Sequence, residues 1–223
     1  MKIIPSLVEP SAYDLFDRIT FLSLYYKQFQ VDIEDGIFIK YKTLSIDEFV
    51  GYVKKNSSSL SPSIIYDFHF MAVDYERSMR LLSEIKELIH IDTVFIHTAL
   101  HPNYQEIQKI DPSFRVGLVI NPEENVAELA QEFSLKTIPL IQLMTIHPGP
   151  QGQAFIPVVL SKIEQLKKQG FLGKIYIDGA VNEQSVSIMS ALPHPPDVLC
   201  PGSYLAKAPH EDLERRVNFL STG

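Results

Sequence analysis

Short apolar runs rich in β-branched residues recur along the whole chain, and longer segments with helical spacing of apolar positions separate them. The runs predict eight strands, at residues 2–8, 28–33, 63–70, 93–97, 115–120, 139–146, 174–178 and 197–201. The intervening segments predict helices, among them 11–25, 74–90, 122–133 and 155–169. In 122–133, Pro122 at the first position and the two acidic residues after it predict the helix start. Repeated strand–helix units indicate a parallel sheet.

Eight such units in 223 residues predict an α/β fold, a (β/α)8 TIM barrel that forms one domain over residues 1–223. The alternative is an open, doubly wound sheet, whose strands are apolar on both faces. Two predicted strands instead alternate, with Gln30 and Asp32 in one and Asp67 and His69 in the other. This alternation favours the barrel, with polar side chains inside it near the carboxyl ends of the strands. Barrel enzymes place their chemistry there.

Composition excludes several classes of protein. With 20 basic and 27 acidic side chains the net charge is −7, which argues against sequence-independent binding of nucleic acid. The lone Cys200 excludes a disulfide framework and a zinc-finger ligand set, and it fits a reducing compartment. No apolar run is long enough for a membrane span, and Pro5 interrupts the N-terminus too early for a secretory signal. We therefore expect a cytoplasmic protein without nucleic-acid or membrane partners.

Two carboxylates stand at equivalent places in the pattern. Asp32 and Asp178 each lie at the inward parity near the end of a strand, with a glycine soon after. If these strands are the second and the seventh, the two side chains face each other across the barrel mouth. Acid/base groups on opposite sides of a bound carbon can remove a proton from one face and return one to the other, as in an epimerisation through an enediolate. The alternative is that each aspartate only caps its following loop.

His69 and Gln30 fall at the same mouth. A divalent ion held between them and the two aspartates would polarise a substrate ketone and stabilise the enediolate oxygen. These ligands come from separate strands and match no local metal motif, so a hydrogen-bonded core histidine is the alternative for His69. The same alternative applies to His97 and His147, which end the fourth and sixth strands.

Glycine-rich loops follow the last three strands. The stretch HPGPQGQAF occupies 147–155, Gly179 follows the seventh strand, and Gly202 with Ser203 follows the eighth. Loops in this part of a barrel commonly bind phosphate through backbone N–H groups, and glycine lets the anion approach closely. Tight turns without a ligand are the alternative.

Two methionines, Met71 and Met144, also fall at inward positions near the mouth. We interpret them as ordinary core packing; the alternative is an apolar wall that excludes water from a reactive carbanion.

Several stretches, in chain order, resemble the ribulose-phosphate 3-epimerase family. They are PSL (5–7), VDIEDGIF (31–38), DFHFM (67–71), IHT (96–98), GLVINP (117–122), LMTIHPGPQGQAFIP (143–157), IDGAV (177–181) and PGS (201–203), the sixth being the most specific. The resemblance implies a barrel that interconverts D-ribulose 5-phosphate and D-xylulose 5-phosphate by metal-assisted proton transfer at C3, in the pentose phosphate pathway.

The resemblance also assigns roles to residues. It implies Asp32 and Asp178 as the acid/base pair, and Asp32, His69 and Asp178 as metal ligands. The implied substrate-binding residues are Ser6, His69, Met71, Met144, Gly149, Gly152, Gln153, Gly179, Ala180, Gly202 and Ser203. The implied partner is a small phosphorylated sugar, and a homo-oligomer is left open because no exposed apolar stripe decides it.

The chain departs from the family pattern around the implied metal and substrate. Gln30 replaces a second metal-binding histidine, which makes Gln30 a weaker oxygen ligand and favours manganese or magnesium over zinc. We expect one divalent ion, with zinc, manganese, iron, cobalt and magnesium all open. Glu34 stands where the family places an apolar methionine, and its charge would oppose a developing carbanion. Ala180 replaces a second glycine after Asp178.

Three functions therefore compete. An active ketose-phosphate 3-epimerase explains the facing acids best, whereas a diverged phosphosugar-binding relative without catalysis would explain Gln30 and Glu34. A decarboxylase of the related sugar-phosphate group needs a D-x-K-x-x-D pattern, and the stretch at 32–35 lacks its lysine.

Overall fold

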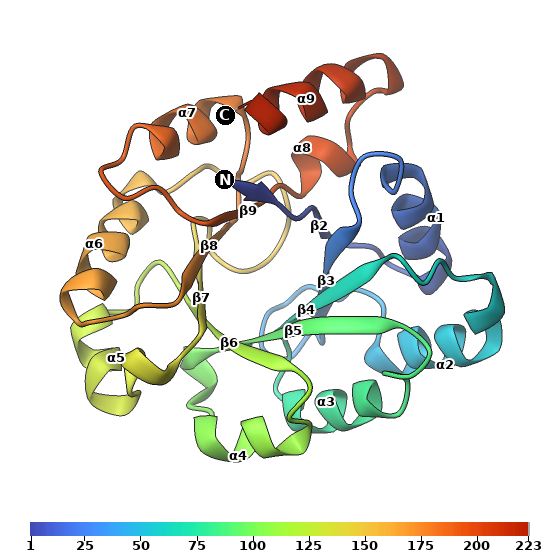
Figure 1. Cartoon of the computed structure of the whole chain (residues 1–223), viewed down its shortest axis with the longest axis horizontal. Helices are drawn as coiled ribbons and strands as arrows, with labels where there is room; N and C mark the ends of the chain where they lie inside the picture. Colours follow the sequence, from blue (N-terminus) through green and yellow to red (C-terminus); the bar gives the residue numbers. More distant parts are fainter. Residues whose placement is uncertain (223) are drawn as a thin grey trace.

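The computed structural model describes residues 1–222, and its strands form one parallel sheet that curls into a ring with the helices outside it (Figure 1). The strands are β1 (Lys2–Ile3), β2 (Ser6–Leu7), β3 (Gln28–Glu34), β4 (Ile65–Met71), β5 (His90–His97), β6 (Arg115–Ile120), β7 (Leu140–Met144), β8 (Lys174–Asp178) and β9 (Val198–Cys200). Their order is β1-β9-β8-β7-β6-β5-β4-β3-β2. The predicted (β/α)8 barrel is confirmed.

The N-terminal segment closes the barrel. β1 pairs with β9 and β2 pairs with β3, so one predicted strand, 2–8, is split into two short ones. Pro5 lies between them, where it has no N–H to donate but its carbonyl accepts from the backbone N–H of Gln30 at 2.9 Å. Because the strand is split, the N-terminal segment pairs with β9 on one side and with β3 on the other.

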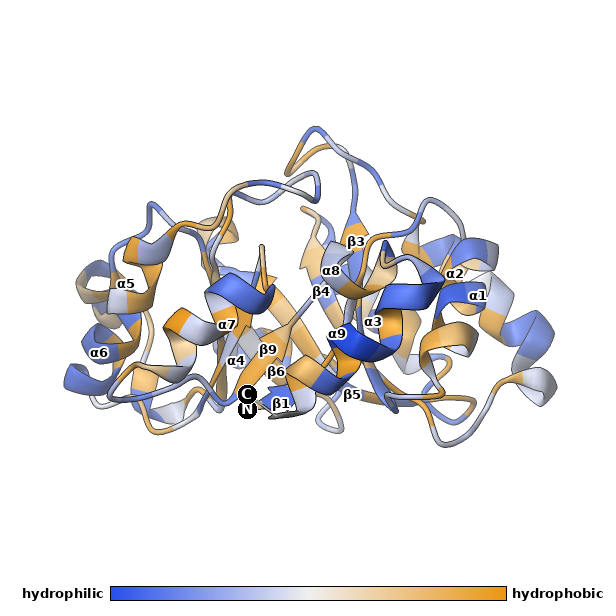
Figure 2. Ribbon diagram, turned by 90° about the horizontal axis from the view of Figure 1, so that it is seen from above, coloured by the Kyte–Doolittle hydropathy of each residue, from blue (hydrophilic) through white to orange (hydrophobic). Residues whose placement is uncertain are grey.

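The helices lie between the strands in sequence and cover the outside of the ring. They are α1 (Ala12–Leu22), α2 (Ile46–Asn56), α3 (Tyr75–Ser83), α4 (Tyr104–Ile110), α5 (Val126–Glu132), α6 (Ser161–Lys168), α7 (Glu183–Ser190), α8 (Ser203–Ala206) and α9 (His210–Thr222). Their outward faces are polar and the strands apolar, as Figure 2 shows. Within residues 1–222, no helix has the length and apolar content that a membrane span requires.

The predicted start of helix 122–133 is wrong. α5 begins at Val126, because the side chain of Asn125 accepts from the backbone N–H of Ala127 and caps the helix there. Glu124 does not sit in the first turn; its carboxylate accepts hydrogen bonds from the backbone N–H of Asn121 and the hydroxyl of Thr98.

The predicted helix 74–90 is also too long. α3 ends at Ser83, and turn hydrogen bonds from the N–H of Ile85 to the carbonyl of Leu82, and from Leu88 to Ile85, carry the chain to β5. These turns bury Ile85 at about helical spacing, which explains why the apolar pattern continues past the helix.

The barrel interior changes character along its length. A core of apolar side chains, including Phe95, Val119, Leu140 and Tyr176, fills the ring. Gly117 makes room for it, because a Cβ at that position would lie 2.5 Å from the ring of Phe95. Polar side chains replace the apolar ones at the carboxyl ends of β3, β4 and β8, as the alternation predicts.

Candidate active site

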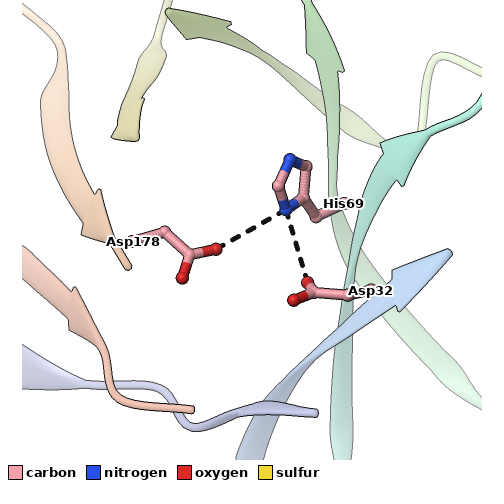
Figure 3. Close-up of side chains that lie close together, drawn as sticks. All are labelled: Asp32, His69 and Asp178. Atoms are coloured by element: carbon pink, nitrogen blue, oxygen red, sulfur yellow. Dashed lines mark ion pairs between the residues drawn. The ribbon is translucent and has the colours of Figure 1, made fainter. Parts of the chain in front are cut away.

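Three side chains converge inside the barrel mouth (Figure 3). Asp32 on β3 and His69 on β4 are paired in the parallel register, and Asp178 ends β8 on the opposite side of the ring. His69 Nδ1 lies 3.4 Å from Asp32 Oδ1 and 3.5 Å from Asp178 Oδ2. All three side chains are buried. The sequence prediction that these residues share one site therefore matches the geometry.

Two glutamine amides tie the carboxylates together. Gln30 donates from Nε2 to Asp32 Oδ1 at 2.9 Å and to Asp178 Oδ2 at 2.6 Å. Gln142 on β7 donates from Nε2 to the same oxygen of Asp178 at 3.0 Å. Asp178 Oδ2 thus accepts two amide hydrogen bonds, whereas Asp32 Oδ1 accepts one.

Burial and charge set the protonation of the other two groups. Burial, followed by the negative charge of Asp178, raises the pKa of Asp32 to about 6. Burial alone would lower the pKa of His69, but hydrogen bonding to Asp178 and Asp32 outweighs it and raises that pKa to about 9. At neutral pH His69 is therefore an imidazolium, and the pKa of Asp32 means that Asp32 takes up a proton as the pH falls to about 6.

His97 supports His69 from behind. It ends β5, is fully buried, and stacks on His69 with ring centroids 4.9 Å apart. Burial and the positive charge of His69 lower the pKa of His97 well below its usual range, so it stays neutral. The ring of Phe38, from the loop after β3, packs against it at 4.8 Å.

A cavity opens above the three residues. It is lined by Ser6, Val8, Asp32, Glu34, Met71, Met144, Ile146, Gly149, Gln151, Gly152, Asp178, Gly179, Ala180, Val181, Gly202 and Ser203. Most of the predicted substrate-binding residues are therefore brought together around one space. His69 lies below it, and Gln153 donates instead to the carbonyls of His147 and Pro150, which shapes the loop.

Close contacts surround two glycines of this rim, Gly179 and Gly202. A Cβ at Gly179 would lie 2.6 Å from Ile146 Cγ1, and Gly179 has a φ of +104°. A Cβ at Gly202 would lie 2.8 Å from Gln151 Nε2 and 3.0 Å from Ser6 Oγ. Ala180 adopts the left-handed region with a φ of 50°, a conformation that a glycine would adopt at lower cost.

His147 and Gln30 do not take up the roles at the barrel mouth that the sequence suggested for them. His147 is exposed and pairs with Glu123 at 3.5 Å, outside the cavity. Gln30 faces the aspartates with its nitrogen, while its oxygen lies 3.6 Å from Cys200 Sγ. An oxygen ligand from Gln30 requires the amide to turn over, so that role stays a prediction.

Sequence reasoning missed two members of the site. Gln142 shares its inward parity with Met144, two residues later, and this parity is the signal that could have revealed it. Gln151 lines the cavity from the glycine-rich loop, which no residue pattern could place over Gly202.

The trio fits a divalent cation. The ligand atoms of Asp32, His69 and Asp178 lie within 4.8 Å of one another, and the group is buried. Two carboxylates and one imidazole are donors that suit manganese, iron, cobalt or zinc. These three residues could therefore hold a metal ion.

Comparison with known proteins agrees with this site. The model of the Ribulose-phosphate 3 epimerase family matches residues 2–205. The chain belongs to this family. Ribulose-phosphate 3-epimerase from Helicobacter pylori is 26% identical over 218 residues, covering 96% of this chain and 94% of the relative. The Bacillus subtilis enzyme of the same name is 26% identical over 166 residues, covering 71% of each. Family and relatives indicate an enzyme of the epimerase type.

Solved structures agree on the fold. 3-Hexulose-6-phosphate synthase from Salmonella typhimurium superposes with a TM-score of 0.68 at 13% identity, covering 100% of this chain and 97% of that one. A mutant tryptophan synthase alpha-subunit from Pyrococcus furiosus gives 0.65 at 18% identity, covering 100% and 98%. At identities this low, the two superpositions show a shared barrel fold and nothing more.

Proposed function

We propose that this chain epimerises a ketose phosphate, interconverting D-ribulose 5-phosphate and D-xylulose 5-phosphate by two-base proton transfer at C3. The observation that carries the proposal is the placement of Asp32 and Asp178 on opposite sides of one cavity. Membership in the family supports the reaction type. The cytoplasm and the pentose phosphate pathway are the expected setting.

The two aspartates divide the proton transfer. One carboxylate removes the C3 proton from its face, and the other, protonated, delivers a proton to the opposite face. Gln30 and Gln142 donate to Asp178 Oδ2 and hold that carboxyl group in place, and the raised pKa of Asp32 leaves a proton on Asp32 at slightly acid pH. When Asp178 acts as the base, Asp32 is the acid, and the reverse reaction exchanges their roles.

The rest of the cavity positions the ligand. The loops at Gly149–Gly152, Gly179 and Gly202 line the cavity with glycines whose backbone amides suit a phosphate group, and the Gln151 side chain lies beside them. Met71, Met144 and Ile146 present apolar surface to the same space and exclude water from the reacting carbon. A divalent cation bound by Asp32, His69 and Asp178 would polarise the ketone and stabilise the enediolate charge.

The test is an epimerisation assay by NMR, with ribulose 5-phosphate and each of magnesium, manganese, zinc, cobalt and ferrous iron. We expect xylulose 5-phosphate to form, and Asp32→Asn or Asp178→Asn to slow it by about 10²–10⁴-fold, as loss of a general acid or base does. Asp67→Asn is the matched control, because Asp67 lies inside the same barrel but hydrogen-bonds to Gln28, away from the mouth. Equal activity in all variants would contradict the proposal.

One observation favours a second candidate, a phosphosugar-binding protein without turnover. The Gln30 amide donates to both carboxylates and thereby occupies the space between them with hydrogens rather than with a ligand atom. Calorimetric binding of ribulose 5-phosphate together with no turnover under any of the five metals would select this candidate.

A further inference from the structure

Glu34 is a third carboxyl group at the mouth. It is the last residue of β3, it lines the cavity with Asp32 and Asp178, and it is only 3% exposed. Among residues 1–222, no hydrogen bond or ion pair involves its carboxyl group, and Oε1 is fully buried without a partner. It does not belong to the Asp32–His69–Asp178 group whose ligand atoms lie close together.

The backbone holds Glu34 firmly in this orientation. Its N–H donates to Thr43 Oγ1 at 2.9 Å, and its carbonyl accepts from the N–H of Thr43 at 3.1 Å. Thr43 Oγ1 also donates to the carbonyl of Asp32 at 2.8 Å, so the returning loop is fastened along the end of the strand. The point on the backbone from which the Glu34 side chain enters the cavity is thus fixed.

A buried acceptor without a donor is costly, and native structures leave few of them unexplained. The neighbouring side chains supply no hydrogen-bond donor to Glu34 Oε1. Met71 lies beside Glu34 in the parallel register, and the apolar lining of the cavity also includes Met144 and Ile146. The missing donor is therefore expected to come from whatever enters the cavity.

The position of Glu34 tells which part of a ligand it meets. It lies two residues beyond Asp32 on the same face of β3, about 6.6 Å further toward the mouth at the usual rise of a strand. For a ligand whose reacting carbon lies between Asp32 and Asp178, Glu34 therefore faces a neighbouring part of the same ligand, nearer the opening of the cavity.

We propose that Glu34 accepts a hydrogen bond from a hydroxyl group of the bound ketose phosphate, at a carbon other than the reacting one, and so selects polyhydroxylated substrates. This rests on the proposed function, because the ligand is the same ketose phosphate. A carboxyl oxygen accepts from a hydroxyl whether or not the group is ionised, so the assignment depends on geometry alone.

The test is calorimetric binding of ribulose 5-phosphate and of inorganic phosphate to the full chain, without turnover as a readout. Glu34→Met removes the acceptor and keeps the size of the side chain, and Glu34→Gln keeps an acceptor oxygen. Glu84→Met is the control, because Glu84 is exposed and pairs with Lys54. We expect Glu34→Met to weaken ribulose 5-phosphate binding by about tenfold or more, with inorganic phosphate within twofold. Glu34→Gln should stay within about threefold for both.

The outcomes separate the two proposals. If Glu34→Met binds ribulose 5-phosphate as tightly as the unaltered chain, the hydroxyl contact is wrong even when epimerisation is observed. If Glu34→Met tightens both ligands, the carboxylate only repels anions, and the contact is again wrong. A selective loss of sugar-phosphate binding in a protein without epimerase activity would support the contact and contradict the proposed reaction.

Discussion

His69 and His97 meet nitrogen to nitrogen, with Nε2 of each ring 2.8 Å apart and the ring planes within 27° of parallel. Only one proton fits between the two nitrogens. As an imidazolium, His69 donates from Nδ1 toward the aspartates and from Nε2 to His97; when Nδ1 instead binds a metal ion, Nε2 keeps its proton and still donates to His97. His97 then keeps its own proton on Nδ1. The pair fixes which nitrogen of His69 is available at the site.

His97→Phe removes this acceptor while it keeps a ring of similar size. Mutating a residue that hydrogen-bonds to a metal-ligating histidine typically lowers metal affinity by about 10–100-fold. We therefore expect manganese to bind the variant about 10–100 times more weakly in calorimetry. His101→Phe is the control, since His101 lies at the surface and pairs with Glu132. Unchanged affinity in His97→Phe would show that His69 is oriented by the aspartates alone.

Gln30→His puts an imidazole between the two carboxylates. Because the present amide offers hydrogens there, we expect the histidine to tighten zinc binding by about tenfold or more. Gln30→Leu serves as the comparison, because it removes the amide and adds no ligand. If leucine tightens zinc binding as much as histidine, the amide acts only as an obstacle, and a fourth ligand is not needed.

Asp67 predicts a pH dependence of stability that is independent of the mouth. Burial, followed by the charge of Asp92, raises its pKa to about 7. The folded state therefore binds a proton that the unfolded chain releases near pH 4, and the free energy of unfolding falls as the pH rises between these values. Relative to Asp67→Asn, the unaltered chain should lose about 2–4 kcal/mol of stability from pH 4 to pH 8 in urea titrations. A constant difference would contradict this origin.

Two glycine-to-alanine changes test the packing inside the barrel. Gly117→Ala places its methyl group against the ring of Phe95 and should cost about 1–3 kcal/mol of stability in urea titrations. Gly51→Ala on α2 has no atom within 4 Å of the added group, and it should gain up to about 1 kcal/mol. Equal effects would show that the interior can relax around Gly117.

The fold followed from alternation, since the period of two along β3, β4 and β8 places Asp32, His69 and Asp178 on the inner face of the ring. The start of α5 could not be predicted in this way. Asn125 and Pro122 are both helix-start signals, and only the local hydrogen bonds decide between them.

The hydrogen bonds within the site could not be predicted from the sequence either. Gln30 and Asp178 are 148 residues apart, and which end of the amide faces the carboxylates depends on side-chain torsions across the barrel. The same holds for the unpartnered oxygen of Glu34, which becomes visible only when every neighbour has a position.

The most direct test of the two-base account is hydrogen exchange at C3 in heavy water, followed by NMR separately from ribulose 5-phosphate and from xylulose 5-phosphate. The unaltered chain should exchange the C3 hydrogen of both sugars and interconvert them. Asp32→Asn and Asp178→Asn should each slow interconversion by about 10²–10⁴-fold, while each still exchanges one sugar, a different one for each variant. Exchange of both sugars by either single variant would show that one base serves both faces, and would contradict the account.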